Sequence, residues 1–470
     1  MATRRVLVLV DGEHYPPVVR AAIDELRAAG DRQVVGAVML GGGEKLRADV
    51  RPDYGVDLVV TGSTLLAGLL EGIEHFHPDE VVDLSDAPVV DARSRMRLAA
   101  HALHRGVPYR GADFAFDPPP RPRLAEKPSI AVIGTGKRTG KTAVAASVAR
   151  VLAAEERPPV IVAMGRGGPA DPEVIEPLTT DLSPAALLAR AEAGRHAASD
   201  HLEDALAAGV ATVGTRRCGG GLAGAPGSST FAAGVALANE RPEPLLLLEG
   251  SGAAIPPVHA DATLCVIPAN ADPEVATGYL GAYALLLSDL VVVTLDDVPP
   301  PGSSRAAIRS LPAPALEDRV RDIAPETPIL RTVLRPWPLA SIEGRSIFFA
   351  TTAPEPIAAR AAAHLESRHH ATVVGRTSHL AERARLVEDL ARIPGGVEVL
   401  VTELKAAAVD VATRAALERG MEVIYCDNRP EPVVTSDDHD GGHDAFYAAA
   451  RALADLATER FEGSQATTSI

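Results

Sequence analysis

The chain has 470 residues, 46% of them hydrophobic, and carries a formal net charge of −16. This length is too great for a single core, and a typical ~150 residues per domain predicts about three domains. The negative charge argues against nucleic acid or a membrane surface as the main partner, because both would repel the chain. Three widely spaced cysteines and the lack of an apolar run of about 18 residues lead us to expect a cytoplasmic protein without disulfides.

Apolar runs alternate with helical periodicity along almost the whole chain, which predicts an α/β fold with parallel sheets. Residues 1–116 are expected to form a Rossmann-like N-terminal domain. Its strands are expected at Arg5–Val10, Gln33–Leu40, Val56–Thr61, Glu80–Leu84 and Val107–Arg110, with helices at Val18–Ala29 and Ala92–Arg105. Asp11 and His14 follow the first strand, and His14 is interpreted either as a catalytic group or as an interdomain contact.

A proline-rich stretch, residues 117–128, lacks periodicity and is predicted to be a linker. It leads into a second domain, over residues 129–340. Residues 341–461 are predicted to form a second, smaller Rossmann-like α/β domain, and residues 462–470 a flexible tail. The strands expected in these two domains are Val160–Ala163, Leu245–Leu248, Thr263–Ile267, Leu290–Leu295, Ile329–Leu334, Ser346–Ala350, Thr372–Val374, Glu398–Thr402 and Glu422–Cys426.

The segment IAVIGTGKRTGKTAVAASVARVL, residues 130–152, has the pattern of a strand, a glycine-rich turn and a helix, which is typical of a phosphate-binding loop. Backbone N–H groups at the start of the helix would bind an anion there. Lys141 would reach the β- and γ-phosphates of ATP, and the Thr142 hydroxyl would ligate Mg²⁺. The expected nucleotide-binding residues are Gly134, Thr135, Gly136, Lys137, Arg138, Thr139, Gly140, Lys141 and Thr142.

Lysine is rare in this chain, which has 46 Lys and Arg residues but only five lysines. Two of the five, Lys137 and Lys141, lie in this one loop, which indicates a need for a compact ammonium group there. Lys405 is isolated in the last domain, and its role stays open.

Three further segments carry candidate site residues. Glu249 ends the apolar run PLLLLEGSG and suits a carboxylate associated with Mg²⁺. The segment AMGRGGPADPE places Arg166 and Gly167 after a strand, where they would bind phosphate or carboxylate, with Asp171 near the metal. The segment TRRCGGGLAG predicts a flexible basic loop that closes over a polyanion, with Arg216, Arg217, Gly219 and Gly220 as substrate-binding residues.

The motifs GTGKRTGKT, MGRGGPADPE, RRCGGGLAG and LLEGSGAAIPP, behind an N-terminal VDGEHYPPV, together resemble the cyclic 2,3-diphosphoglycerate synthetase family over essentially the full length. The GT-containing loop by itself is similar to that of dethiobiotin synthetase. The resemblance implies ATP-driven closure of an intramolecular phosphoanhydride in 2,3-diphosphoglycerate, which releases ADP and phosphate. In this hypothesis Lys141, Arg166 and Lys137 are the catalytic residues, and Thr142, Glu249 and Asp171 hold Mg²⁺.

Two alternatives remain at this point. One is a carboxylate-activating synthetase of the dethiobiotin synthetase type, which needs fewer cations around its substrate. The other is a non-enzymatic, ATP-dependent switch of the partitioning-ATPase type, whose binding surface should be basic or amphipathic. A homodimer is possible, because the predicted helices of the last domain are rich in alanine.

Overall fold

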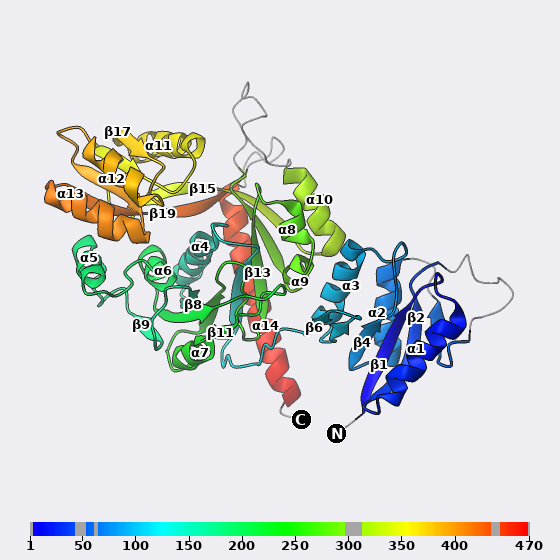
Figure 1. Cartoon of the computed structure of the whole chain (residues 1–470). Coiled ribbons are helices and arrows are strands. Elements are labelled where there is room, and N and C mark those ends of the chain that lie inside the picture. Colours follow the sequence, from blue (N-terminus) through cyan, green and yellow to red (C-terminus); the bar gives the residue numbers. More distant parts are fainter. Residues whose placement is uncertain (1–2, 43–52, 61–63, 297–312, 434–441, 469–470) are drawn as a thin grey trace.

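The computed structural model describes residues 3–42, 53–60, 64–296, 313–433 and 442–468 (Figure 1). Thr61, which ends one expected strand, lies outside the described residues. The described strands form two sheets, one of six strands and one of thirteen, and helices cover their faces. The α/β class predicted from the sequence is confirmed. Among the described residues, no helix is long and apolar enough to cross a membrane.

The six-stranded sheet belongs to the N-terminal part of the chain and has the order β3-β2-β1-β4-β5-β6. Its central strand runs parallel to both neighbours, and five of its residues are buried on both faces. The strand order reverses between β1 and β4, as in Rossmann-like folds. The elements are β1 (Arg4–Val10), α1 (Pro16–Ala28), β2 (Arg32–Met39), β3 (Leu58–Val60), α2 (Leu65–Phe76), β4 (Glu80–Asp83), α3 (Ala92–His104), β5 (Tyr109–Arg110) and β6 (Ala115–Phe116).

The larger sheet begins with the strands that surround the glycine-rich loop, in the order β11-β10-β8-β12-β7-β13-β14. Its central strands are apolar throughout because helices cover both faces, so alternate residues of β7 enter two different cores. Its first elements are β7 (Ser129–Gly134), α4 (Lys141–Ala154), β8 (Pro159–Gly165), β9 (Glu173–Ile175), α5 (Pro184–Glu192), α6 (Asp200–Ala208), β10 (Thr212–Cys218), β11 (Ser228–Ser229) and α7 (Phe231–Asn239). They are followed by β12 (Leu245–Glu249), β13 (Ala262–Pro268), α8 (Pro273–Thr277), α9 (Gly281–Leu286), β14 (Leu290–Thr294) and α10 (Ala313–Ile323).

Two long strands, β15 (Ile329–Pro338) and β19 (Glu422–Pro432), continue this sheet into the C-terminal part of the chain. The first residues of β15 pair with β14 in parallel, whereas residues 332–338 pair antiparallel with β19. The strands of the third unit expected from the sequence continue the sheet of the central unit. The other elements there are β16 (Ser346–Ala350), α11 (Glu355–His369), β17 (Thr372–Thr377), α12 (Arg383–Ala391), β18 (Val399–Glu403), the π-helix Ala408–Thr413 and α13 (Arg414–Glu418).

The last helix, α14 (Gly442–Thr468), returns to the central unit and runs beside β7, β13 and α4 (Figure 1). Phe446, Leu453 and Ala457 are buried in the same core as α4. The sequence pattern predicts this helix at the end of the third unit, with a flexible tail at residues 462–470 after it. In the structure the helix covers the central sheet instead, and it continues through residues 462–468.

Candidate active site

The loop between β7 and α4 contains the predicted phosphate-binding residues. β7 ends at Gly134, and α4 begins at Lys141 directly after Gly140, whose φ of 87° is left-handed. A Cβ atom on Gly134 would lie 2.9 Å from the Val266 carbonyl oxygen, and one on Gly140 would lie 2.9 Å from Leu334 Cδ1. Both positions therefore require glycine, and the loop turns tightly at a helix N-terminus, where unpaired N–H groups favour an anion.

Lys141 is buried inside this loop, with 7% of its surface exposed. Its ammonium group donates to the Gly136 carbonyl oxygen at 2.8 Å and to Thr139 Oγ1 at 3.3 Å. Burial lowers the pKa of Lys141, whereas the carboxylates of Glu249 and Asp200 act in the opposite direction. The group is therefore a cation held in a poorly hydrated place, where it interacts strongly with any anion in the loop.

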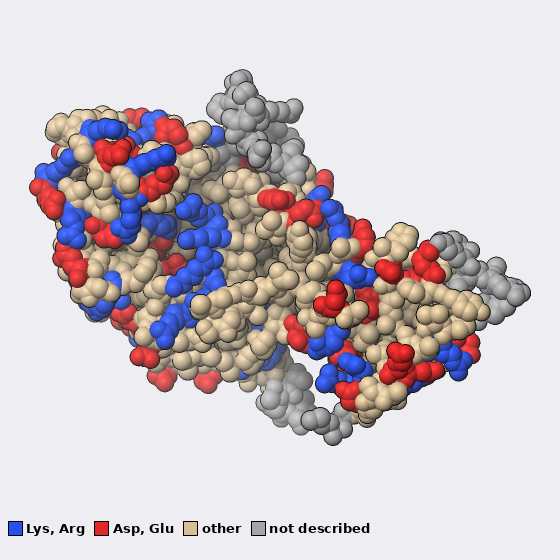
Figure 2. All heavy atoms as spheres, viewed as in Figure 1, with Lys and Arg blue, Asp and Glu red and all other residues tan. Residues whose placement is uncertain are grey.

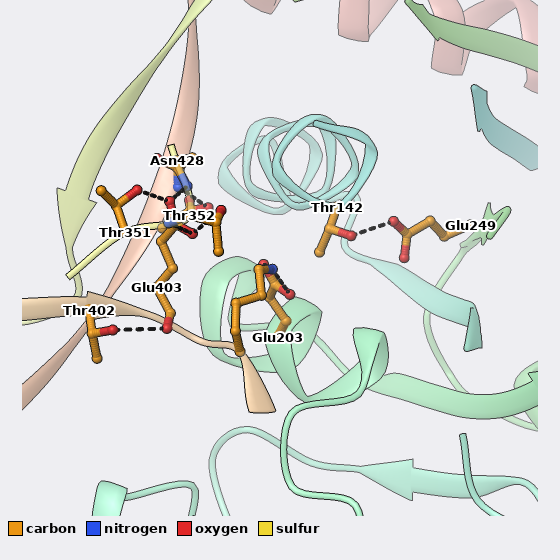
Figure 3. A network of polar contacts seen from close by, with 10 residues as sticks. Thr142, Glu203, Glu249, Thr351, Thr352, Thr402, Glu403 and Asn428 are labelled. Atoms are coloured by element: carbon orange, nitrogen blue, oxygen red, sulfur yellow. Dashed lines mark hydrogen bonds and ion pairs between the residues drawn. The ribbon is translucent and has the colours of Figure 1, made fainter. Parts of the chain in front are cut away.

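Thr142 and Glu249 meet beside the loop, as the sequence predicts for a metal site. The Thr142 hydroxyl donates to Glu249 Oε1 at 2.8 Å (Figure 3). Glu249 is the last residue of β12, and only 2% of its surface is exposed. Because β12 is parallel to β7, its carboxyl end lies at the same sheet edge as the loop.

Sequence reasoning missed a second buried carboxyl group at this place, that of Asp204 on α6. Asp204 is fully buried and adjacent to Glu249, and its two oxygens and Glu249 Oε2 meet no N–H or O–H donor among the described residues. Burial and the neighbouring Glu249 raise the pKa of Asp204, while burial and Asp200 raise the pKa of Glu249. Two carboxyl groups this close need a shared proton or a cation between them.

Two of the predicted guanidinium groups converge on the loop that follows Glu249. A Cβ atom on Gly252 would lie 2.6 Å from Arg166 Nη2 and 3.2 Å from Arg217 Nη2. Arg217 donates to the Ser251 carbonyl oxygen at 2.7 Å and to that of Gly219 at 2.6 Å. Arg166 is close enough to repel both Arg217 and Lys141, and this repulsion contributes to the lowered pKa of each group. These three cations thus share one region of the sheet edge.

Lysine and arginine side chains also gather in a visible hollow between the C-terminal strands and the central unit, over the region of α4 and β8 (Figure 2). On the face in view, acidic side chains lie mostly around the hollow rather than inside it. The hollow therefore concentrates positive charge in a chain whose formal net charge is −16.

The other predicted site residues occupy more peripheral places. Lys137 and Arg138 are exposed on the loop. Arg216 is exposed as well, and no hydrogen bond or ion pair of its side chain is formed with the described residues. Asp171 is exposed and makes no hydrogen bond to Thr142 or Glu249, and its place near the metal stays a prediction.

The glycines predicted to bind substrate lie close to the converging side chains or to the backbone around them. A Cβ atom on Gly220 would lie 3.7 Å from Arg217 Nη1, and one on Gly167 would lie 2.8 Å from the His196 ring. Gly219 has a φ of 74°. The structure corrects one detail, because Thr215–Cys218, expected in a flexible loop, belong to β10, where Arg216 pairs with Gly165.

Lys405, the isolated lysine, bridges the C-terminal strands to α6. Its ammonium group binds both carboxylate oxygens of Glu203, at 2.7 and 2.6 Å. Nearby Glu403 accepts hydrogen bonds from Thr351, Thr352 and Asn428 (Figure 3). Lys405 thus holds the helix that carries Asp204.

Asp11 and His14 lie on the other sheet, at the carboxyl end of β1. His14 Nδ1 is 2.8 Å from Asp11 Oδ1, and the same oxygen accepts the backbone N–H groups of Glu13 and His14. Figure 1 shows the N-terminal sheet well separated from α4. The Asp11–His14 pair therefore organises its own turn and does not approach Lys141.

Comparison with known proteins adds three matches to family profiles, all of one family. Residues 5–117, 129–333 and 338–429 match the N-terminal, P-loop and C-terminal domains of cyclic 2,3-diphosphoglycerate synthetase. The chain belongs to the cyclic 2,3-diphosphoglycerate synthetase family. Its P-loop domain binds nucleotide, and like its relatives the protein is an enzyme, which excludes the non-enzymatic switch.

Several relatives of that name align along nearly all of the chain. The Rubrobacter xylanophilus synthetase is 45% identical over 91% of this chain and 94% of its own length. The Methanothermobacter thermautotrophicus synthetase is 41% identical over 97% of this chain and 98% of its own length. The Thermococcus gammatolerans synthetase is 45% identical over 90% of this chain and 93% of its own length. Among solved structures, LpxK from Aquifex aeolicus in complex with ATP matches with a TM-score of 0.40 at 11% identity, over 73% of this chain and 90% of its own length.

A sequence signal for the missed carboxyl groups does exist. The segment SDHLEDALAA begins with a helix-capping residue and places Asp200 and Asp204 one helical turn apart, on the same face. That spacing alone could not show which strand the helix covers. Asp204 and Glu249 are 45 positions apart in the sequence, and hydrophobic periodicity does not predict contacts between residues so far apart.

Proposed function

We propose that this protein joins the two phosphoryl groups of 2,3-diphosphoglycerate in an ATP-dependent reaction that yields cyclic 2,3-diphosphoglycerate, ADP and phosphate. The observation that carries the proposal is the convergence of Arg166 and Arg217 at Gly252, beside the loop that holds Lys141. Family membership supports it, because relatives that align with more than 90% of this chain bear this name.

The chemistry proceeds in two phosphoryl transfers. In the first, an oxygen of one substrate phosphate attacks the γ-phosphorus of ATP, the bond to the β-phosphate oxygen breaks, and ADP leaves. In the second, an oxygen of the other substrate phosphate attacks the activated phosphorus of the first, and inorganic phosphate leaves. The product contains one P–O–P bridge. No side-chain nucleophile takes part in either transfer.

The protein contributes positioning and charge neutralisation in this scheme. The two phosphates of the substrate repel each other, so they need several cations to approach within bonding distance. Arg166 and Arg217 suit that task because planar guanidinium groups bind phosphate through two parallel hydrogen bonds. Lys141 would hold the transferred phosphoryl group, while Lys137, Arg138 and Arg216 would contribute from the rim.

The residues present fit a Mg²⁺ ion. Thr142, Glu249 and Asp204 offer only oxygen ligands, and three of the carboxylate oxygens lack a donor among the described residues. No cluster of three or more His, Cys, Asp or Glu side chains with metal-site geometry occurs in the described ranges. This suits Mg²⁺, which proteins usually hold through one or two carboxylates together with substrate phosphates and water. When bound, the ion would neutralise the charge of the ATP phosphates, and Thr142 and Glu249 would hold it.

We also infer a cytoplasmic location, which the three free cysteines, Cys218, Cys265 and Cys426, support. The homodimer stays a prediction, and analytical ultracentrifugation would decide it. The domain limits 1–116, 129–340 and 341–461 likewise stay a proposal.

The test is the release of phosphate from ATP in the presence of different substrates. We expect 2,3-diphosphoglycerate to stimulate the release and the substrates of dethiobiotin synthetase to leave it unchanged. Lys141→Ala should abolish the stimulated rate. Stimulation by the dethiobiotin synthetase substrates alone would instead support the carboxylate-activating alternative.

A further inference from the structure

A second group of basic side chains lies at the opposite edge of the central sheet. There a cavity of about 490 Å³ opens between α3, the linker after β6, the starts of β13 and β14, and the end of α14. The basic residues that line it are His104, Arg121, Arg123, His259 and Arg460. This volume is within the range of small-molecule sites in proteins, about 300–1,000 Å³.

The cavity is distinct from the nucleotide loop because the strands between them are parallel. The loop follows the carboxyl end of β7, and the cavity lies at the amino ends of β13 and β14. Ala262 at the cavity end of β13 pairs with Ile130, and Val266 at its other end pairs with Gly134. The two places are thus separated by the length of the sheet.

The two acidic residues of the cavity wall are already engaged in the fold. Asp261 Oδ2 accepts hydrogen bonds from the backbone N–H of Ser129 at 3.0 Å and from its hydroxyl at 2.7 Å. Asp289 accepts the Thr263 N–H at 2.9 Å and the Arg460 guanidinium at 2.7 Å. Arg460 also donates to the Asp261 carbonyl oxygen at 2.9 Å. These three residues form the frame of the cavity and together carry one net negative charge, which Arg123 offsets through its ion pair with Asp261.

Among the remaining basic groups, Arg121 has the Tyr283 hydroxyl as a partner and forms no ion pair with the described residues. The Nε–H of Arg121 is inaccessible to solvent and has no hydrogen-bond partner among the described residues. Arg123 is exposed and reaches Asp261 Oδ1 only at 3.4 Å. Burial together with Arg123 and Arg121 lowers the pKa of His259 to about 4, and partial burial with Arg105 and Arg121 lowers that of His104. Burial is the larger cause for both imidazoles, and the nearby guanidinium groups act in the same direction.

We propose that this cavity is a binding site for a small polyanion that carries phosphate or carboxylate groups. Arg121 and Arg123 supply planar donor groups that match either anion, and the two imidazoles are placed to become charged donors when the anion arrives. The five basic residues come from the N-terminal unit, the linker, the central unit and α14, so the bound anion would join all of them.

Histidine NMR of the full chain tests this directly. We would follow the Cε1–H signals of His104 and His259, assigned with His104→Gln and His259→Gln, while adding inorganic pyrophosphate at constant ionic strength. The expected result is a saturable shift of both signals toward the charged form. The shift should persist in Lys141→Ala, which separates it from binding at the nucleotide loop.

Arginine variants identify the binding groups. Arg121→Gln should weaken pyrophosphate binding by about tenfold or more, since it removes charged hydrogen bonds. Arg385→Gln, an exposed change on α12, should leave it unchanged. If Arg121→Gln does not fold, Arg123→Gln serves instead, because that side chain is 59% exposed, and a weakening of about threefold is expected. A shift that rises linearly without saturation, or arginine variants that bind as tightly as Arg385→Gln, would overturn the proposal.

Discussion

At the scale of single residues, Arg216 and Arg217 have different roles because adjacent side chains of a β-strand point to opposite sides. Arg217 contacts the Ser251 and Gly219 carbonyl oxygens and approaches Gly252, whereas Arg216 stays exposed. The sequence could show that two arginines precede a run of glycines. It could not show that both belong to β10, where successive side chains point to opposite sides.

This difference predicts unequal effects of two matched substitutions. Arg217→Gln should lower kcat for phosphate release by about 10²–10³, which is typical for the loss of one donor that stabilises a transition state. Arg216→Gln should cost less than about tenfold, since its side chain is exposed and is not among the nearest neighbours of a Cβ on Gly252. Steady-state kinetics with 2,3-diphosphoglycerate and ATP measure both. Equal losses in the two variants would contradict the assignment of Arg217.

At the scale of elements, α6 connects the nucleotide loop to the C-terminal strands. Asp204 lies against Glu249, while Glu203, the preceding residue, binds Lys405. The sequence indicated an unusual lysine at position 405 but not its partner, because the two residues are 202 positions apart. Local patterns thus predicted the helix and the lysine separately, and only the tertiary fold brings them together.

Lys405→Met should therefore destabilise the interface around α6. Removing the ammonium group leaves Glu203 without its partner, and we expect a loss of about 1–2 kcal/mol, less than for a fully buried pair because both side chains are partly exposed. Urea unfolding measures this change, and the KM for ATP should rise as well.

The double variant Glu203→Gln with Lys405→Met is the control. It removes both charges, so part of the lost stability should return if the two groups interact. If the stability lost in the double variant equals the sum of the losses in Lys405→Met and Glu203→Gln, then Lys405 acts on something other than Glu203.

At the scale of the whole molecule, the C-terminal part of the chain is joined to the central unit in two ways. Its strands continue the central sheet, and α14 packs against α4, β7 and β13. The strands around the glycine-rich loop could be predicted because apolar runs such as Leu245–Glu249 are buried on both faces. The final helix could be predicted as a helix, but its place could not, because an amphipathic pattern shows that one face is covered without showing by what. Its packing against α4 requires the long return made by β15 and β19.

Leu453→Ala tests this packing. Leu453 is 4% exposed and packs in the core shared with α4, so the substitution should cost about 2–4 kcal/mol in the unfolding of the central unit. Leu417→Ala, at a residue that is 40% exposed, is the matched control and should cost far less. Thermal unfolding compares them, and equal melting temperatures for the two variants would contradict the packing of α14 on the central unit.

The central claim is that Lys141, Arg166 and Arg217 bring two mutually repelling phosphoryl groups together at a nucleotide loop. Phosphorus NMR of 2,3-diphosphoglycerate incubated with ATP, Mg²⁺ and the protein tests it most directly. We predict new pyrophosphate-like resonances from the substrate, with ADP and inorganic phosphate formed in equal amounts. Conversion of ATP to ADP and phosphate with the 2,3-diphosphoglycerate resonances unchanged would contradict the claim.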